Sequence, residues 1–212
     1  MSTPSSTPTQ WIAFARGKRV GAGEPRTVAS AVKQLVDADP QASVAVFDMD
    51  NSASIEIDLR GSVAAVCKRL PMPDTPQTPS DVATPAEAPR GPGRPRLGVV
   101  AREVTLLPRH WEWLAAQPGG ASVALRKLVE RAQRANAESD RLRAAAESAY
   151  RFMHALAGDA AGFEEASRAL FAGDLAQLRT QVARWPRDVR QHLLTLAQRA
   201  VAAPADAAPK AP

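Results

Sequence analysis

The chain has 212 residues, of which 45% are hydrophobic, and a formal charge of +5 from 27 basic and 22 acidic side chains. The single cysteine, Cys67, excludes an internal disulfide, so nothing in the composition implies an oxidising compartment. The sequence shows neither a signal peptide nor an apolar stretch long enough to cross a bilayer, so we expect a cytoplasmic protein of one or two small domains that does not enter a membrane.

The first part of the chain predicts a small α+β domain at residues 11–70, after a Ser/Thr/Pro-rich segment, residues 1–10, that we expect to be disordered. Alternating apolar residues predict strands, and apolar residues at helical spacing, such as Val28, Val32 and Leu35, predict helices. The expected element order is ββαββα. Strands are predicted at 11–17, 18–24, 43–50 and 54–61, and helices at 27–38 and 62–70.

Residues 71–96 are rich in proline and arginine and predict a flexible linker. A strand is predicted at 99–107, and the sequence after it is mostly helical, with breaks at 118–120 and at Gly158, Gly162 and Gly173. The second half therefore divides into a strand-helix-helix segment at 97–134, a helical region at 135–203 and a loose tail at 204–212.

One short motif is typical of an enzyme. VAVFDMDN, residues 44–51, resembles the first motif of haloacid-dehalogenase-like phosphatases, which implies Asp48 as a nucleophile beside magnesium. The long sheet and the downstream lysine and acidic residues of that family are missing, so we interpret Asp48 and Asp50 as turn residues. The three histidines lie far apart without metal-ligand spacing, and we expect no catalytic activity, no metal site and no cofactor.

Basic charge is concentrated in residues 90–134. This segment holds nine basic and three acidic residues, a net charge of +6, so the other 167 residues together carry −1. A basic segment on a nearly neutral chain is typical of a nucleic-acid-binding protein, although a solvated helix face gives the same pattern.

A strand followed by two helices within residues 97–134 resembles a ribbon-helix-helix module. Such modules pair their strands across a homodimer and lay the two-stranded ribbon in the major groove. The resemblance implies that Ala101, Glu103 and Thr105 face the groove. It also implies a phosphate site at the backbone amides of residues 120–122, which include Ser122. Arg102 and Arg126 would supply basic contacts to the DNA. Glu103 departs from the basic or amide residues usual there. The core is expected from Val104, Leu106, Trp111, Leu114, Leu125 and Leu128.

Just before this segment, Gly93-Arg94-Pro95 between Arg90 and Arg96 resembles an AT-hook. In that motif the Gly-Arg-Pro core enters a narrow A·T minor groove, and flanking bases hold phosphates.

A longer stretch, GRPRLGVVAREVTLLPRHWEWLAAQPGGASVALRKLVERA with YRFMHALAGDAAGFEEASRALFAGD after it, resembles a bacterial family known as domain of unknown function 2239. The resemblance extends over most of the chain and implies no activity. The sequence therefore favours a DNA-binding homodimer, a transcriptional or nucleoid-type regulator; the alternative is a non-catalytic protein–protein interaction module.

Overall fold

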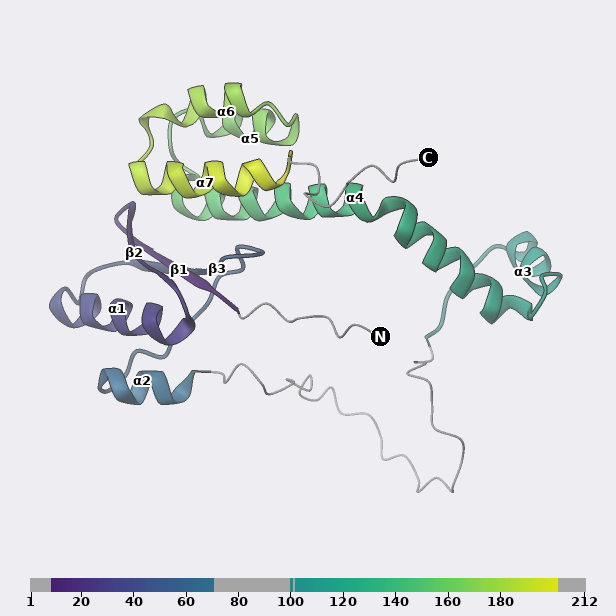
Figure 1. Cartoon of the computed structure of the whole chain (residues 1–212), viewed down its shortest axis with the longest axis horizontal. Helices are drawn as coiled ribbons and strands as arrows, with labels where there is room; N and C mark the ends of the chain where they lie inside the picture. The colour runs from purple at the N-terminus through teal and green to yellow at the C-terminus, as the bar shows by residue number, and fades with distance from the viewer. Residues whose placement is uncertain (1–8, 71–99, 101, 202–212) are drawn as a thin grey trace, which may run out of the picture. The chain divides into compact units, whose positions relative to one another are not determined.

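The computed structural model describes residues 9–70, 100 and 102–201 (Figure 1). Their contacts divide the chain into two compact units. The first, the sheet unit, combines residues 9–70 with residues 138–201; the second, the α3 unit, consists of Val100 and residues 102–137. The chain is thus α+β with a mostly helical second half, as the sequence predicts. No helix in the described ranges has the length and apolarity needed to span a membrane.

A three-stranded antiparallel sheet lies at the centre of the sheet unit. Its strands are β1 (Trp11–Ala15), β2 (Lys18–Gly23) and β3 (Val44–Asp48), in the order β2-β1-β3. Arg16 and Gly17 join β1 to β2 with φ angles of 50° and 75°, a two-residue turn with positive φ that matches the twist of antiparallel strands. Three of the four strands predicted in this domain, those at 11–17, 18–24 and 43–50, are confirmed.

One face of the sheet is covered by α1 (Pro25–Ala38) and α2 (Val63–Arg69), and Figure 1 shows both helices on the same side of the strands. Successive residues of a strand point to opposite faces, so Trp11 and Ala13 of β1 are directed to this side. The apolar residues of the two helices bury these positions. The cluster consists of Trp11, Ala13, Val28, Ala29, Val32, Val46 and Val66.

The opposite face packs against helices from the second half of the chain. Next to the strands are the C-terminal part of α4 (Gly120–Ala157) and α7 (Arg187–Arg199) (Figure 1). Residues of α5 (Phe163–Phe171), α6 (Leu175–Gln181) and a short 3₁₀ turn at Val182–Arg184 complete the same apolar cluster. Phe152 of α4 lies between Phe14 and Phe47, with ring centroids 5.3 and 5.5 Å away. Edge-to-face rings at this distance pack favourably, and they join the sheet to the helices.

The predicted strand at 54–61 is wrong, and the observed order before the linker is ββαβα. Only Ser54 forms a bridge, with Phe47, and the Ile55 amide donates to the Val46 carbonyl at 2.8 Å. The guanidinium group of Arg69 donates instead to the carbonyls of Asp58 and Arg60. These bonds tie residues 58–60 to the end of α2, and beyond Ile55 the segment is held by α2 and not by β3.

The α3 unit contains α3 (Pro108–Ala115) and the first turns of α4. Gly119 and Gly120 separate the helices with φ angles of 89° and 74°, which confirms the predicted break. Leu114 and Ala124 are the buried apolar residues within 102–137.

Candidate nucleic-acid interface

The predicted DNA-binding residues fall into two groups. The AT-hook-like residues, together with the linker and both chain ends, lie outside the described residues. The remaining four belong to the α3 unit, and all four are exposed. The first group is Arg90, Gly93, Arg94, Pro95 and Arg96; the second is Arg102, Thr105, Ser122 and Arg126.

The strand predicted at 99–107 is not formed in the described part of this segment. Val100 and residues 102–107 belong to no strand, and Leu107 is the extended residue that precedes α3. Val104, which was expected in the core, is 54% exposed. A strand requires a neighbour that pairs with its amides and carbonyls, and none of the described residues pairs with 102–107.

The start of α4 offers less to a phosphate than the sequence predicts. Among the three amides at 120–122, that of Gly120 already donates to the Gln117 carbonyl at 2.9 Å. The Ser122 carbonyl accepts the Nε–H of Arg126 at 3.2 Å, which lays the Arg126 side chain along the helix. Ser122 and Arg126 are therefore brought together.

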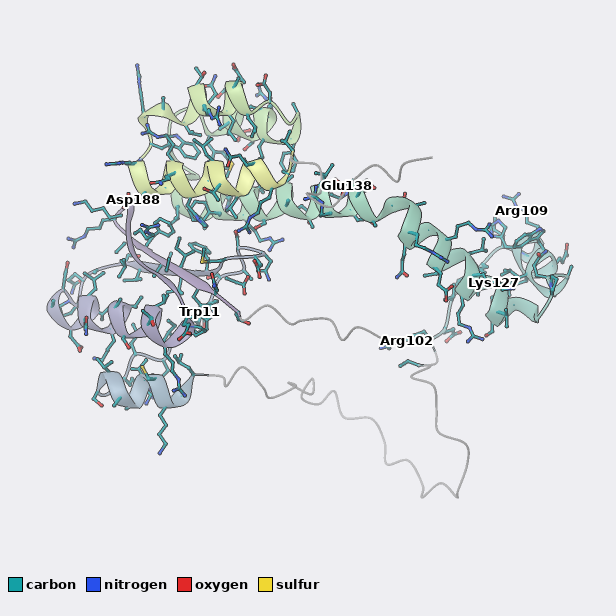
Figure 2. All side chains as sticks on the ribbon, viewed as in Figure 1. Trp11, Arg102, Arg109, Lys127, Glu138 and Asp188 are labelled. Carbon is teal, nitrogen blue, oxygen red and sulfur yellow. The ribbon has the colours of Figure 1, made fainter. Side chains whose placement is uncertain are left out.

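A more continuous basic surface lies farther along α4. Lys127, Arg131 and Arg134 are four and three residues apart, which places them on one face of the helix. All three are exposed; we call them the basic stripe. Figure 2 labels Lys127 on α4 and Arg109 on the neighbouring α3. The sequence prediction named Arg126 and missed the stripe, although the spacing of its basic residues could have identified it.

Few acidic side chains neutralise the basic stripe. Arg134 donates through Nε to the Glu130 carbonyl at 3.1 Å and lies 3.8 Å from the Glu130 carboxylate. Neither Lys127 nor Arg131 forms an ion pair with another described residue. The exposed cations are thus available to a polyanion such as a nucleic-acid backbone.

The stripe ends where acidic residues begin. Arg141 donates to both carboxylate oxygens of Glu138, at 2.7 and 3.0 Å. These hydrogen bonds hold the pKa of the Glu138 carboxyl below its usual range and raise that of Arg141. The pair has no net charge, so we expect phosphate contacts to stop near Arg134.

The motif that resembles a phosphatase forms a closed turn at the end of β3. The Asp48 carboxylate accepts the amides of Asp50 and Asn51 at 2.8 and 3.1 Å, and Ser52 has a φ of 55°. Such bonds are the usual role of aspartate in a turn. Within the described ranges, no group of three or more His, Cys, Asp or Glu residues could hold a metal ion.

Helices of the sheet unit fix this turn in place. The hydroxyls of Ser52 and Ser148, a residue of α4, are hydrogen-bonded at 2.9 Å in a buried position. Arg151 donates to the Asn51 carbonyl, and Arg199 donates to that of Met49 at 3.1 Å. The observed contacts of the turn are therefore structural.

A hollow of about 660 Å³ lies elsewhere on the sheet unit, beside the end of α4. The residues that line it include Tyr150, His154, Phe163 and Glu164. Tyr150 also lies 5.5 Å from Phe171, whose side chain is exposed. Aromatic side chains around a depression are typical of a surface that contacts another molecule.

Comparison with known protein families gives a match over most of the chain. A family described as "Uncharacterized protein conserved in bacteria (DUF2239)" matches residues 10–197. No curated protein and no solved structure matches the chain.

Proposed function

The chain belongs to the DUF2239 family of bacterial proteins, and from its own residues we propose that it is a cytoplasmic DNA-binding protein that acts as a homodimer. The observation that carries the proposal is the exposed basic stripe of α4. Residues 102–137 contain six basic and three acidic residues, in a chain whose positive excess lies entirely within 90–134. Clustered cations on one helix face are the electrostatic signature of nucleic-acid binding.

The stripe is suited to phosphates. Arginine presents a planar fork of donors that matches a phosphate, and each cation that neutralises a phosphate releases a counterion into solution. Contacts of this kind position a protein on DNA without reading the bases. Sequence preference is proposed to come from Arg94 in an A·T minor groove, and from Thr105 if residues 99–107 of two copies pair as a ribbon in the major groove.

A salt titration of the full chain on duplex DNA tests this proposal. We expect replacement of Lys127, Arg131 and Arg134 by Gln to weaken binding at low salt and to lower the slope of log affinity against log salt by about one unit per residue. In a matched control variant, three exposed arginines of the sheet unit are replaced by Gln: Arg179, Arg184 and Arg187. We expect this variant to keep the wild-type salt slope.

Two results contradict the proposal. Equal losses in both triple variants would mean that net charge, and not the stripe, attracts DNA. If the wild type does not bind duplex DNA even at low salt, the DNA-binding proposal is wrong.

The hollow beside Tyr150 and Phe163 favours the second candidate function, a non-catalytic module that binds another protein. Tyr150, His154 and Phe163 contribute aromatic side chains to its walls, and the hollow lies in the sheet unit, apart in sequence from the basic stripe. If this candidate is correct and the first is not, Glu164→Arg, at an exposed position of the wall of the hollow, abolishes capture of a protein partner while the chain shows no affinity for DNA.

A further inference from the structure

The α3 unit exposes the apolar residues that a domain of its size normally buries. Seven of the nine large hydrophobic side chains that are exposed in the described chain belong to this unit. They are Val100, Val104, Leu107, Trp111, Trp113, Leu128 and Val129. Apolar side chains concentrated in this way mark a surface that binds a partner.

The apolar residues of α4 follow a coiled-coil repeat. From Leu125 to Leu156, small or apolar residues recur at alternating spacings of three and four. This heptad pattern keeps one seam directed towards a neighbouring helix. The positions are Leu125, Leu128, Ala132, Ala135, Ser139, Leu142, Ala146, Ala149, Met153 and Leu156.

The two ends of the repeat have different surroundings. Ala149 and Met153 are fully buried in the core of the sheet unit, with Leu156 packed against it. The first four positions, from Leu125 to Ala135, are half-buried or exposed, and Leu128 is 38% exposed. One pattern therefore runs from a covered stretch into an uncovered one. We call the four uncovered positions the apolar seam.

We propose that the seam is covered by the seam of a second copy of this chain, in a two-stranded coiled coil. The inference rests on the homodimer of the proposed function but not on DNA binding. A seam with this repeat is self-complementary, so two copies cover each other around a two-fold axis. Ala132 and Ala135 let the two helices approach closely, and Leu125 and Leu128 supply the larger apolar contacts.

The charges beside the seam also fit a second copy. Arg131 and Glu138 occupy the same flanking position in successive heptads, and Arg143 occupies the opposite flank. In a parallel pair, Glu138 lies beside Arg143 of the other copy. In an antiparallel pair, it lies beside Arg131 of the other copy. Either orientation brings opposite charges together, beside the exposed ion pairs that Glu138 and Arg143 already form with Arg141 and Asp140 of their own helix.

The pairing leaves most of the DNA-binding surface accessible. Lys127 and Arg134 lie outside the seam and its flanking positions, and Arg126 is also directed away from it. A seam without charged side chains does not attract a polyanion, so nucleic acid is not the expected occupant. Dimerisation would instead place two basic stripes on one particle, which strengthens binding to a long duplex.

Sedimentation of the full chain without DNA tests the inference. The wild type should be a dimer, and Leu128→Glu should raise the dimer dissociation constant at least tenfold. Gln133→Glu adds the same charge on the outer surface of the same helix and should change the dimer dissociation constant less than twofold. Folding of each variant is checked by circular dichroism. A monomeric wild type, or equal effects of the two substitutions, overturns the inference.

Val104→Glu separates the coiled coil from a ribbon at residues 99–107. If Val104→Glu dissociates the dimer and Leu128→Glu does not, the ribbon alone holds the two copies together and the coiled coil is wrong. If the dimer depends on Leu128 but wild-type protein does not bind DNA, the coiled coil stands and the DNA-binding proposal fails.

Cross-linking gives a second readout. In a Cys67→Ser background, Ala132→Cys alone should form a disulfide-linked dimer if the helices are parallel. If the helices are antiparallel, a mixture of the Ala132→Cys and Ala135→Cys variants should form a disulfide-linked dimer. Gln133→Cys should not cross-link. Cross-linking at the seam that is no faster than at position 133 contradicts the proposal.

Discussion

The sheet unit and the α3 unit contain helices of similar amphipathic pattern but differ in what covers their apolar sides. Of the 28 buried apolar residues in the described chain, 26 lie in the sheet unit and two, Leu114 and Ala124, in the α3 unit. The sheet unit covers its helices with its own strands. The described residues of the α3 unit form no sheet, and most of their large apolar side chains remain on the surface. An apolar pattern in a sequence therefore predicts that a face will be covered, but not whether the cover comes from the same chain.

The largest expected effect tests this contrast directly. Phe152 is fully buried between Phe14 and Phe47, so Phe152→Ala should lower the free energy of unfolding by about 3–5 kcal/mol, measured by urea denaturation. Trp113→Ala, in the α3 unit, removes a larger side chain that is 52% exposed and should cost less than about 1 kcal/mol. Similar losses at both positions would mean that the α3 unit has a core of its own.

A second prediction concerns pH and applies only to the sheet unit. His192 lies against Phe14 and Phe152, and burial, with Arg199 and Arg19 nearby, lowers its pKa from 6.5 to about 4. The unfolded chain therefore binds this proton at a higher pH than the folded chain, and stability falls as pH decreases from about 7 to 5. After allowance for partial exposure, we expect a loss of about 1–2 kcal/mol in this range.

Denaturation at several pH values measures this loss. His192→Gln should flatten the dependence between pH 7 and 5, whereas His110→Gln, at an exposed position of the α3 unit, should keep it. The range excludes the acid region in which Asp58 and Glu138, whose pKa values are lowered by arginine partners, take up protons. An unchanged slope in His192→Gln contradicts the assignment.

Sequence analysis predicted the elements that depend on local pattern, including β1 to β3, α1 and the break at Gly119. It did not predict that residues 138–201 cover the sheet formed by residues 11–48, because contacts such as Ser52–Ser148 join positions 96 residues apart and leave no local signal. The strand at 54–61 was wrong: pairing with β3 stops after Ile55, and Arg69 ties residues 58–60 to α2, a contact that alternating apolar residues do not reveal. In the candidate DNA interface, the cluster of charge was visible in the sequence. The exposure of Val104 was not, because it depends on whether another segment pairs with residues 102–107, and no described residue does.

The third prediction sharpens the contrast at the contact between Ser148 and the β3 turn. Ser148→Ala removes the buried hydrogen bond to Ser52 and leaves that hydroxyl without its observed protein partner. We expect a loss of about 1–2 kcal/mol in the free energy of unfolding. Ser122→Ala, at an exposed position of the α3 unit, should change it by less than about 0.5 kcal/mol. Equal stability of the two variants would show that the turn does not depend on α4.

The smallest expected effect is at Asp48, in the sheet unit. Its carboxylate oxygen accepts two amides of the turn, and the side-chain carbonyl of asparagine can accept the same two bonds. Asp48→Asn should therefore leave the free energy of unfolding within about 0.5 kcal/mol of wild type. The same substitution removes the only group at this position that could act as a nucleophile towards phosphorus. Assays with a generic phosphate ester and magnesium separate the two roles: if the wild type hydrolyses the ester and Asp48→Asn folds normally but does not, the turn is part of an active site, and the prediction that the chain is not an enzyme is wrong.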